Sequence, residues 1–152
     1  MSESTTNDPT GEPRTRAQGE PEGQKWLSGI VSLIGLWIAI TPAFYTAATS
    51  MTWNNVLIGG AIFLLAGYNY YRITNGYRTS TGVMSLVALL ALWTLVAPFA
   101  FAGQVATEGL AVASQALVWN NVAGGLIMAV LAAYIAYAAG TAVRTGTAAG
   151  TK

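Results

Sequence analysis

The chain has 152 residues, of which 53% are hydrophobic and only 9% carry a charge. Soluble domains average about 25% charged residues, so this composition excludes an ordinary soluble globular domain. Eight of the thirteen charged residues precede position 26, which leaves three long uncharged runs at 26–71, 79–107 and 109–143. Because a helix needs about 20 apolar residues to cross a bilayer, these runs accommodate two, one and one membrane spans.

The inventory of reactive side chains excludes most kinds of chemistry. The chain has no cysteine and no histidine, so thiol nucleophiles, disulfides, histidine-ligated haem or zinc and Ser-His-Asp triads are not available. Glu108 is the only carboxylate side chain after position 25, and the net charge is +1. We therefore expect no enzymatic activity, no cofactor, no metal site and no nucleic-acid partner.

Residues 1–25 are rich in Pro, Gly, Ser, Thr and Glu. A segment with so little apolar surface is expected to be a disordered tail. It lacks the basic start followed directly by an apolar stretch that marks a secretory signal. The alternative, a docking segment for a partner, has no motif to support it.

The apolar runs predict an all-α fold, a transmembrane bundle of four helices within a membrane domain at 26–139. The expected spans are 26–44, 53–72, 81–101 and 117–139, followed by a polar tail at 140–152. A short polar turn at 73–80 and a longer connection at 102–116 join them. Pro42 is expected to bend or end the first span, and Pro98 has the same place in the third.

The basic residues predict how the bundle is oriented. With four spans, both termini and the 73–80 turn lie on one side, and that side carries all seven Lys and Arg residues. The connections at 45–52 and 102–116 carry none. For a protein of the cell membrane, the positive-inside rule predicts that both termini lie in the cytoplasm.

The sequence contains an internal repeat. Trp37 and Pro42 recur 56 positions later as Trp93 and Pro98, with four residues between Trp and Pro in each copy. The tetrapeptide Trp-Asn-Asn-Val begins at Trp53 and recurs 66 positions later. The repeats cover about 26–72 and 81–139. Because each holds two spans, both enter the membrane in the same direction, and we expect a pseudo-twofold axis along the membrane normal.

These residues resemble the SPW repeat family of small prokaryotic membrane proteins. The matching positions are Trp37, Pro42, Trp53, Asn54, Trp93, Pro98, Trp119 and Asn120. The chain departs from the Ser-Pro-Trp signature, because it has Thr41-Pro42-Ala43 in one repeat and Ala97-Pro98-Phe99 in the other. The resemblance implies an integral membrane protein and no defined activity.

The two Asn pairs of the repeat, Asn54-Asn55 and Asn120-Asn121, are the most informative polar residues in the spans. The first interpretation is that one Asn of each pair caps the N-terminus of its helix. The second is hydrogen bonding between helices across the pseudo-twofold axis. A ligand site built from the four Asn side chains is the third.

The aromatic and small residues have structural interpretations. Trp53 and Trp119 should anchor the outer ends of their spans, and Arg72 should extend to the headgroups. Small residues let membrane helices approach closely, so we expect the second and fourth spans to form the tight centre of the bundle. The residues expected in that contact are Gly60, Gly67, Gly125, Ala129 and Ala133, with Ala136 continuing the course.

The favoured function is that of a structural or accessory membrane protein that associates with itself or with another membrane component. The alternative is a transporter or channel for small neutral solutes, lined by the Asn pairs and by Ser32, Thr41, Ser85 and Thr94. Convergence of these side chains on one cavity would favour the solute pathway, whereas a dry seam of small residues would favour the structural role.

Overall fold

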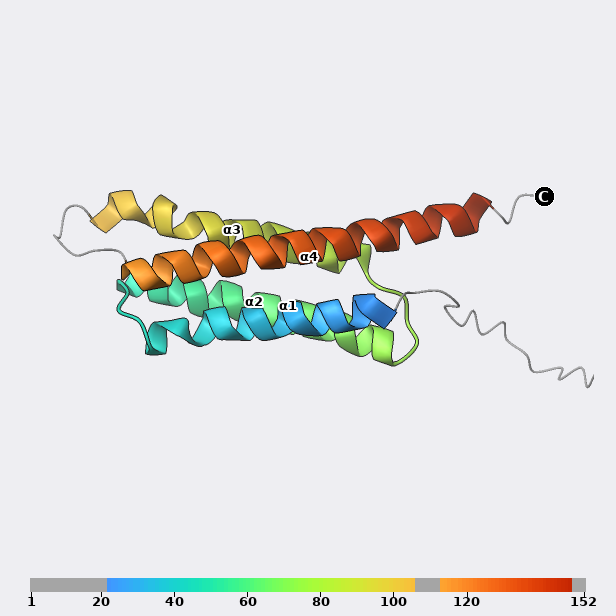
Figure 1. Cartoon of the computed structure of the whole chain (residues 1–152), viewed down its shortest axis with the longest axis horizontal. Coiled ribbons are helices and arrows are strands. Elements are labelled where there is room, and N and C mark those ends of the chain that lie inside the picture. Colours follow the sequence, from blue (N-terminus) through green and yellow to red (C-terminus); the bar gives the residue numbers. More distant parts are fainter. Residues whose placement is uncertain (1–21, 106–112, 149–152) are drawn as a thin grey trace, which may run out of the picture.

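The computed structural model describes residues 22–105 and 113–148, which form four long helices (Figure 1). The helices are α1 (Glu22–Ile40), α2 (Thr49–Thr74), α3 (Thr81–Val105) and α4 (Gln115–Ala148), with a short 3-10 helix η1 (Thr41–Ala43) after α1. Each of the four contains a stretch long and apolar enough to cross a membrane. The predicted all-α fold is confirmed for the described residues, and the chain is a multi-pass membrane protein.

The ends of the helices differ from the predicted boundaries. Helix α1 begins at Glu22, so the prediction of a disordered tail is wrong for 22–25, while residues 1–21 lie outside the described part of the chain. Helix α4 continues to Ala148, well into the segment predicted as a polar tail. The membrane-crossing stretch of α4 runs from Gln115 to Arg144, past the predicted end of the fourth span at 139.

The two repeat prolines have different effects. Helix α1 ends at Ile40, and Pro42 lies in the first turn of η1, as predicted. Pro98, in contrast, lies inside α3, which continues to Val105. A proline within a helix removes the bond to the carbonyl four residues earlier, here that of Thr94, and membrane helices tolerate such a loss where neighbouring groups compensate.

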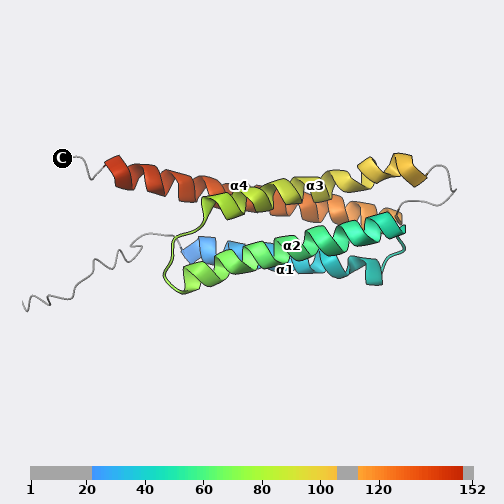
Figure 2. The ribbon, with the colours of Figure 1, turned by 180° about the vertical axis from the view of Figure 1, so that it is seen from behind.

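The helices run up and down as two hairpins that lie one on the other (Figures 1 and 2). Within each hairpin the packing is closest, α1 on α2 and α3 on α4; between them α2 lies beside α3 and α1 beside α4. Helices α2 and α4 are therefore diagonally opposite. The prediction that they form the tight centre of the bundle is wrong.

The close contacts lie within each hairpin because of the helix face on which the glycines lie. A Cβ atom on Gly59 would lie 2.6 Å from the Ala39 backbone nitrogen, and one on Gly125 would lie 2.7 Å from that of Leu95. Each of these glycines thus allows backbone-to-backbone approach within its own hairpin. The expected contacts are not made at Gly60, where a Cβ would meet nothing within 4 Å, or at Ala133, which is exposed.

The other small residues predicted in the contact between α2 and α4 pack elsewhere in the bundle. A Cβ on Gly67 would lie 3.2 Å from Ser32 Oγ, so Gly67 faces α1. Ala129 and Ala136 are buried in the main apolar core.

Buried positions follow the same spacing in α2 and α4. In α2 they are Met51, Asn55, Gly59, Ile62, Ala66 and Asn69. In α4 the positions 66 residues later are buried too: Leu117, Asn121, Gly125, Met128, Ala132 and Ile135. Steps of three and four residues keep one helical face toward the core. Asn55 and Asn121 thus lie on the core faces of α2 and α4, about one turn after Met51 and Leu117, which belong to a small apolar cluster.

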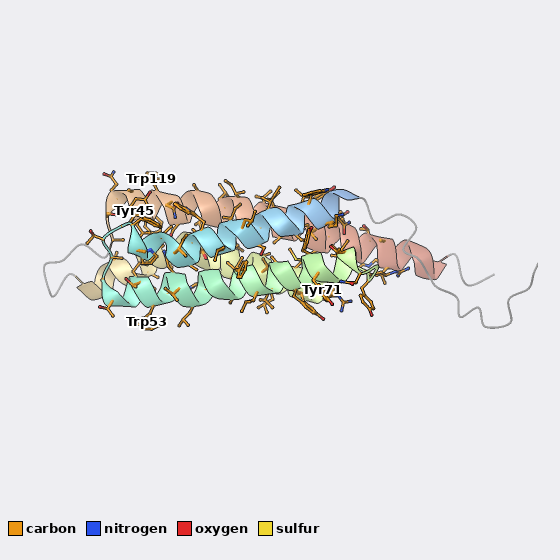
Figure 3. The ribbon with its side chains drawn as sticks, turned by 90° about the horizontal axis from the view of Figure 1, so that it is seen from below. Tyr45, Trp53, Tyr71 and Trp119 are labelled. Carbon is orange, nitrogen blue, oxygen red and sulfur yellow. The ribbon has the colours of Figure 1, made fainter. Side chains whose placement is uncertain are left out.

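The two ends of the bundle differ in chemistry. The start of α1 and the α2–α3 turn lie at one end of the bundle, and α4 extends beyond them in the same direction (Figure 1). We call this the basic end, because it carries Lys25, Arg72, Arg78 and Arg144. The other end, with η1 and the starts of α2 and α4, is called the Trp-Asn end. Figure 3 shows Trp53 and Trp119 at this end and Tyr71 near the other.

Candidate functional site

The centre of the Trp-Asn end is a pair of buried amides on the diagonal of the bundle. Asn55 Nδ2 donates to Asn121 Oδ1 at 3.1 Å, and Asn121 Nδ2 donates to Asn55 Oδ1 at 2.8 Å. Both side chains are fully buried. The two bonds join α2 to α4 through the middle of the bundle, where their backbones do not touch closely.

The turn after α1 is tied to this pair. Asn55 Nδ2 also donates to Thr41 Oγ1 at 3.2 Å, and Thr41 Oγ1 donates to the Ile38 carbonyl at 2.7 Å. Thr41 is fully buried. The Phe44 and Tyr45 amides both donate to the Thr41 carbonyl, which closes η1 around the same residue. The residue before Pro42 therefore connects the turn to the amide pair.

Two tryptophans complete the site with matching bonds. Trp37 Nε1 on α1 donates to Asn120 Oδ1 on α4 at 2.8 Å. Trp93 Nε1 on α3 donates to Asn54 Oδ1 on α2 at 2.8 Å. Each bond joins a residue of the first half to a residue of the second. Figure 1 shows the helix pairs concerned side by side, α1 with α4 in front and α2 with α3 behind.

The structure decides between the interpretations of the Asn pairs. Helix α2 begins at Thr49, with Ala48 in the capping position and no side-chain capping bond. In α4 the Ser114 Oγ accepts from the Leu117 amide, so a serine caps that helix. Helix capping by asparagine is therefore wrong, because both Asn pairs lie in the second turn. The interhelical hydrogen bonding offered as the second interpretation is present.

The two halves of the site are not identical. Asn54 Nδ2 donates weakly to Asn55 Oδ1 at 3.4 Å. Its counterpart, Asn120 Nδ2, is buried without a hydrogen-bond partner among the described residues. Trp37 stacks on Phe44 with ring centroids 6.0 Å apart, whereas Trp93 meets Phe101 edge-on at 6.3 Å.

A second polar network, which was not predicted, lies near the basic end. Asn69 Nδ2 donates to Ser28 Oγ at 2.9 Å, and Asn69 Oδ1 accepts from the Ser80 amide at 3.0 Å. Thr79 Oγ1 donates to Gln24 Oε1 at 2.8 Å, and both side chains are buried. The network ties the start of α1 to the α2–α3 turn. Its signal in the sequence was a lone asparagine in the apolar face of α2.

The other proposed pathway residues do not face a common space. Ser32 Oγ donates to the Phe63 carbonyl at 2.9 Å, which binds α1 to α2. Thr94 Oγ1 donates to the Leu90 carbonyl of its own helix at 3.0 Å. Ser85 is exposed on the outside of the bundle. These hydroxyls thus satisfy backbone carbonyls or face outward, as Ser and Thr in membrane helices commonly do.

Arg72 is held by its neighbours at the basic end. Its guanidinium lies 5.7 Å from the Tyr68 ring centroid and 5.8 Å from that of Tyr77. It donates to Tyr68 Oη and to the Arg78 carbonyl, both at 3.3 Å. Its Nε is buried without a hydrogen-bond partner among the described residues. That Arg72 extends to the headgroups stays a prediction.

Trp37→Phe and Trp93→Phe should each lower the stability of the bundle in detergent by about 0.5–1.5 kcal/mol, because each removes one bond to an asparagine. Trp53→Phe and Trp119→Phe, at exposed positions of the same end, are the matched controls. The measurement is the unfolding midpoint followed by circular dichroism. Equal losses for all four variants would show that the two indole bonds contribute nothing specific.

Comparison with known proteins places the chain in a family. The family model described as the SPW repeat domain matches residues 25–135, which is most of the chain and includes the whole site. No match was found among curated proteins or among solved structures. Four of the residues that carry the resemblance form the two indole bonds of the site: Trp37 with Asn120 and Trp93 with Asn54. The chain belongs to the SPW repeat family.

Proposed function

We propose that this protein has a structural or accessory role in the cell membrane, without enzymatic activity, and associates with itself or with another membrane component. The observation that carries the proposal is the use of the motif asparagines. Asn55 and Asn121 satisfy each other in the core, and Asn54 and Asn120 accept from tryptophans of the opposite half. Apart from Asn120 Nδ2, which has no partner among the described residues, these amide groups are bonded to other side chains of the bundle, and such bonds stabilise the contacts between its helices.

The proposal includes a two-repeat architecture with a pseudo-twofold axis along the bundle. Its support is the agreement between sequence offsets and contacts. Trp37 and Trp93 make the same kind of bond, Gly59 and Gly125 make the same close approach, and Asn55 and Asn121 bond reciprocally. A relation of this kind makes the two hairpins equivalent partners within one bundle.

The role is tested by purifying the full-length protein from its native membrane in mild detergent and measuring the mass of the complex and the proteins that copurify. We expect an oligomer or a stable complex with a second membrane protein. The same preparation is reconstituted in liposomes and assayed for flux of small neutral solutes, with empty liposomes as control. A lone monomer that conducts solutes would contradict the proposal and support the transporter or channel.

The orientation is tested with single cysteines at two exposed positions, Thr49→Cys at the Trp-Asn end and Asn75→Cys at the basic end. The native chain contains no cysteine that would interfere. If both termini are cytoplasmic, an impermeant maleimide added to intact cells labels position 49 and not position 75. Labelling both after permeabilisation is the control, and the reverse pattern in intact cells would contradict the orientation.

A further inference from the structure

A groove between α1 and α2 lies toward the basic end of the bundle. It has a volume of about 400 Å³, within the range of about 300–1,000 Å³ that is usual for small-molecule sites. Its walls include Trp26, Gly29, Ile30, Leu33, Gly67 and Tyr70. Trp26, Ile30 and Leu33 are largely exposed on the outside of the bundle, so the groove opens toward the lipid.

Two glycines, Gly29 on α1 and Gly67 on α2, line the groove. A Cβ on Gly29 would lie 3.4 Å from the Tyr70 ring, and one on Gly67 would lie 3.2 Å from Ser32 Oγ, so each glycine lets a side chain of the other helix lie close to its backbone. The one hydroxyl of a serine in the wall, Ser32 Oγ, is bonded to the Phe63 carbonyl. The walls therefore suit an apolar chain.

A positive charge lies beside one wall of the groove. Lys25 immediately precedes Trp26, and its Nζ lies 5.6 Å from the centroid of the Trp26 ring. Arg72, the other basic residue of these two helices, is already held by Tyr68 and the Arg78 carbonyl. A lysine at the level of the headgroups attracts anionic phosphate, and the acyl chain of the same molecule would then extend along the groove.

The corresponding place in the second hairpin lacks these features. At the repeat offsets, Lys25 is replaced by Thr81 and Trp26 by Gly82 on α3, while Gly67 is replaced by Ala133 on α4. Tyr70 is likewise replaced by Ala136. The combination of a cation, an aromatic wall and a small-residue floor is therefore specific to the first half and does not follow from the packing common to both.

We propose that this groove binds one acyl chain of an anionic phospholipid, with the headgroup phosphate near Lys25. The site is independent of the structural role proposed above and depends only on the chain lying in a membrane. It would give the first hairpin a fixed lipid at its surface, which the second hairpin does not have.

The test is native mass spectrometry of the full-length protein in micelles that contain either phosphatidylglycerol or phosphatidylcholine. We expect one phosphatidylglycerol to be retained per chain, in preference to phosphatidylcholine. Lys25→Gln should weaken phosphatidylglycerol binding about fivefold, the factor for one basic residue near an anionic surface. Lys25→Arg should keep the preference. Arg78→Gln, which removes an exposed charge at the same end, is the matched control and should bind as the wild type does.

The binding of the acyl chain in the groove is tested with Trp26→Ala, which removes one wall. The control is Trp119→Ala, a substitution at a similarly exposed position of the other end. Trp26→Ala should reduce retention of both lipids, and Trp119→Ala should not; unfolding midpoints show that both variants are folded. Equal retention of the two lipids by the wild type, or equal effects of Lys25→Gln and Arg78→Gln, would overturn the proposal. A lipid-free dimer broken by Trp26→Ala would assign the groove to a second copy of the chain instead.

Discussion

Gly59→Ala is expected to destabilise the bundle by about 1–3 kcal/mol or more, although it adds only one methyl group. The new Cβ would lie 2.6 Å from the Ala39 nitrogen, 2.8 Å from the Gly35 carbonyl oxygen and 3.0 Å from the Ala39 Cα. All three are backbone atoms of α1, which cannot move aside as a side chain can. The two helices must separate, and the close contact that replaces hydrophobic drive between membrane helices is lost.

The neighbouring residue provides the control for this substitution. A Cβ at Gly60 would meet nothing within 4 Å, so Gly60→Ala should leave stability unchanged or raise it slightly through the better helix propensity of alanine. Unfolding by sodium dodecyl sulfate in mixed micelles, followed by circular dichroism, measures both variants. Similar unfolding midpoints for the two would contradict the close approach of α1 and α2.

The second hairpin allows an independent repetition. Gly125→Ala would place its Cβ 2.7 Å from the Leu95 nitrogen and 2.8 Å from the Ala91 carbonyl oxygen. Gly124→Ala would meet the flexible end of Ile38, its Cδ1 at 3.1 Å, which is able to yield. Gly125→Ala should therefore be the more harmful of this pair.

Asn55→Leu is expected to cost about 1–3 kcal/mol, because the Asn121 amide would remain buried without its partner. Thr41 would lose its bond from Asn55 Nδ2 as well. The double variant Asn55→Leu/Asn121→Leu leaves no unpaired amide of this pair, so its cost should be clearly smaller than the sum of the two single costs. That coupling energy measures the interaction. Interhelical bonds in membranes average about 0.6 kcal/mol, so most of the single-variant loss would come from the unpaired group.

Asn75→Leu is the control for this cycle. It removes a bond from Asn75 Nδ2 to the Tyr71 carbonyl, but this bond is exposed and water can replace it, so the loss should be small. Unfolding midpoints in detergent are measured for the wild type, the two single variants, the double variant and the control. Strictly additive single costs would show that the Asn55 and Asn121 amides do not interact in detergent. The two hydrogen bonds between them would then contribute nothing to stability.

Several features followed from the sequence because they depend on local properties of the chain. The number of spans depends on the length of uncharged apolar runs, and all four membrane-crossing helices were predicted in this way. Pro42 ends the first helix because its ring removes a backbone donor. The repeat offsets also identified the residues that meet at the Trp-Asn end. None of these three features requires knowledge of how the helices face one another.

The tertiary structure decided which face of each helix meets which neighbour. In spans that are apolar on all sides, the sequence does not distinguish the core face from the lipid face. The small-residue pattern therefore predicts a contact at Gly60, whereas Gly59 makes it. The pairing of helices also determined that Asn55 and Asn121 bond to each other and cap nothing. Hydropathy and length are properties of a single helical segment. These contacts depend on how two helices are rotated and cross each other, which is defined only in the packed bundle.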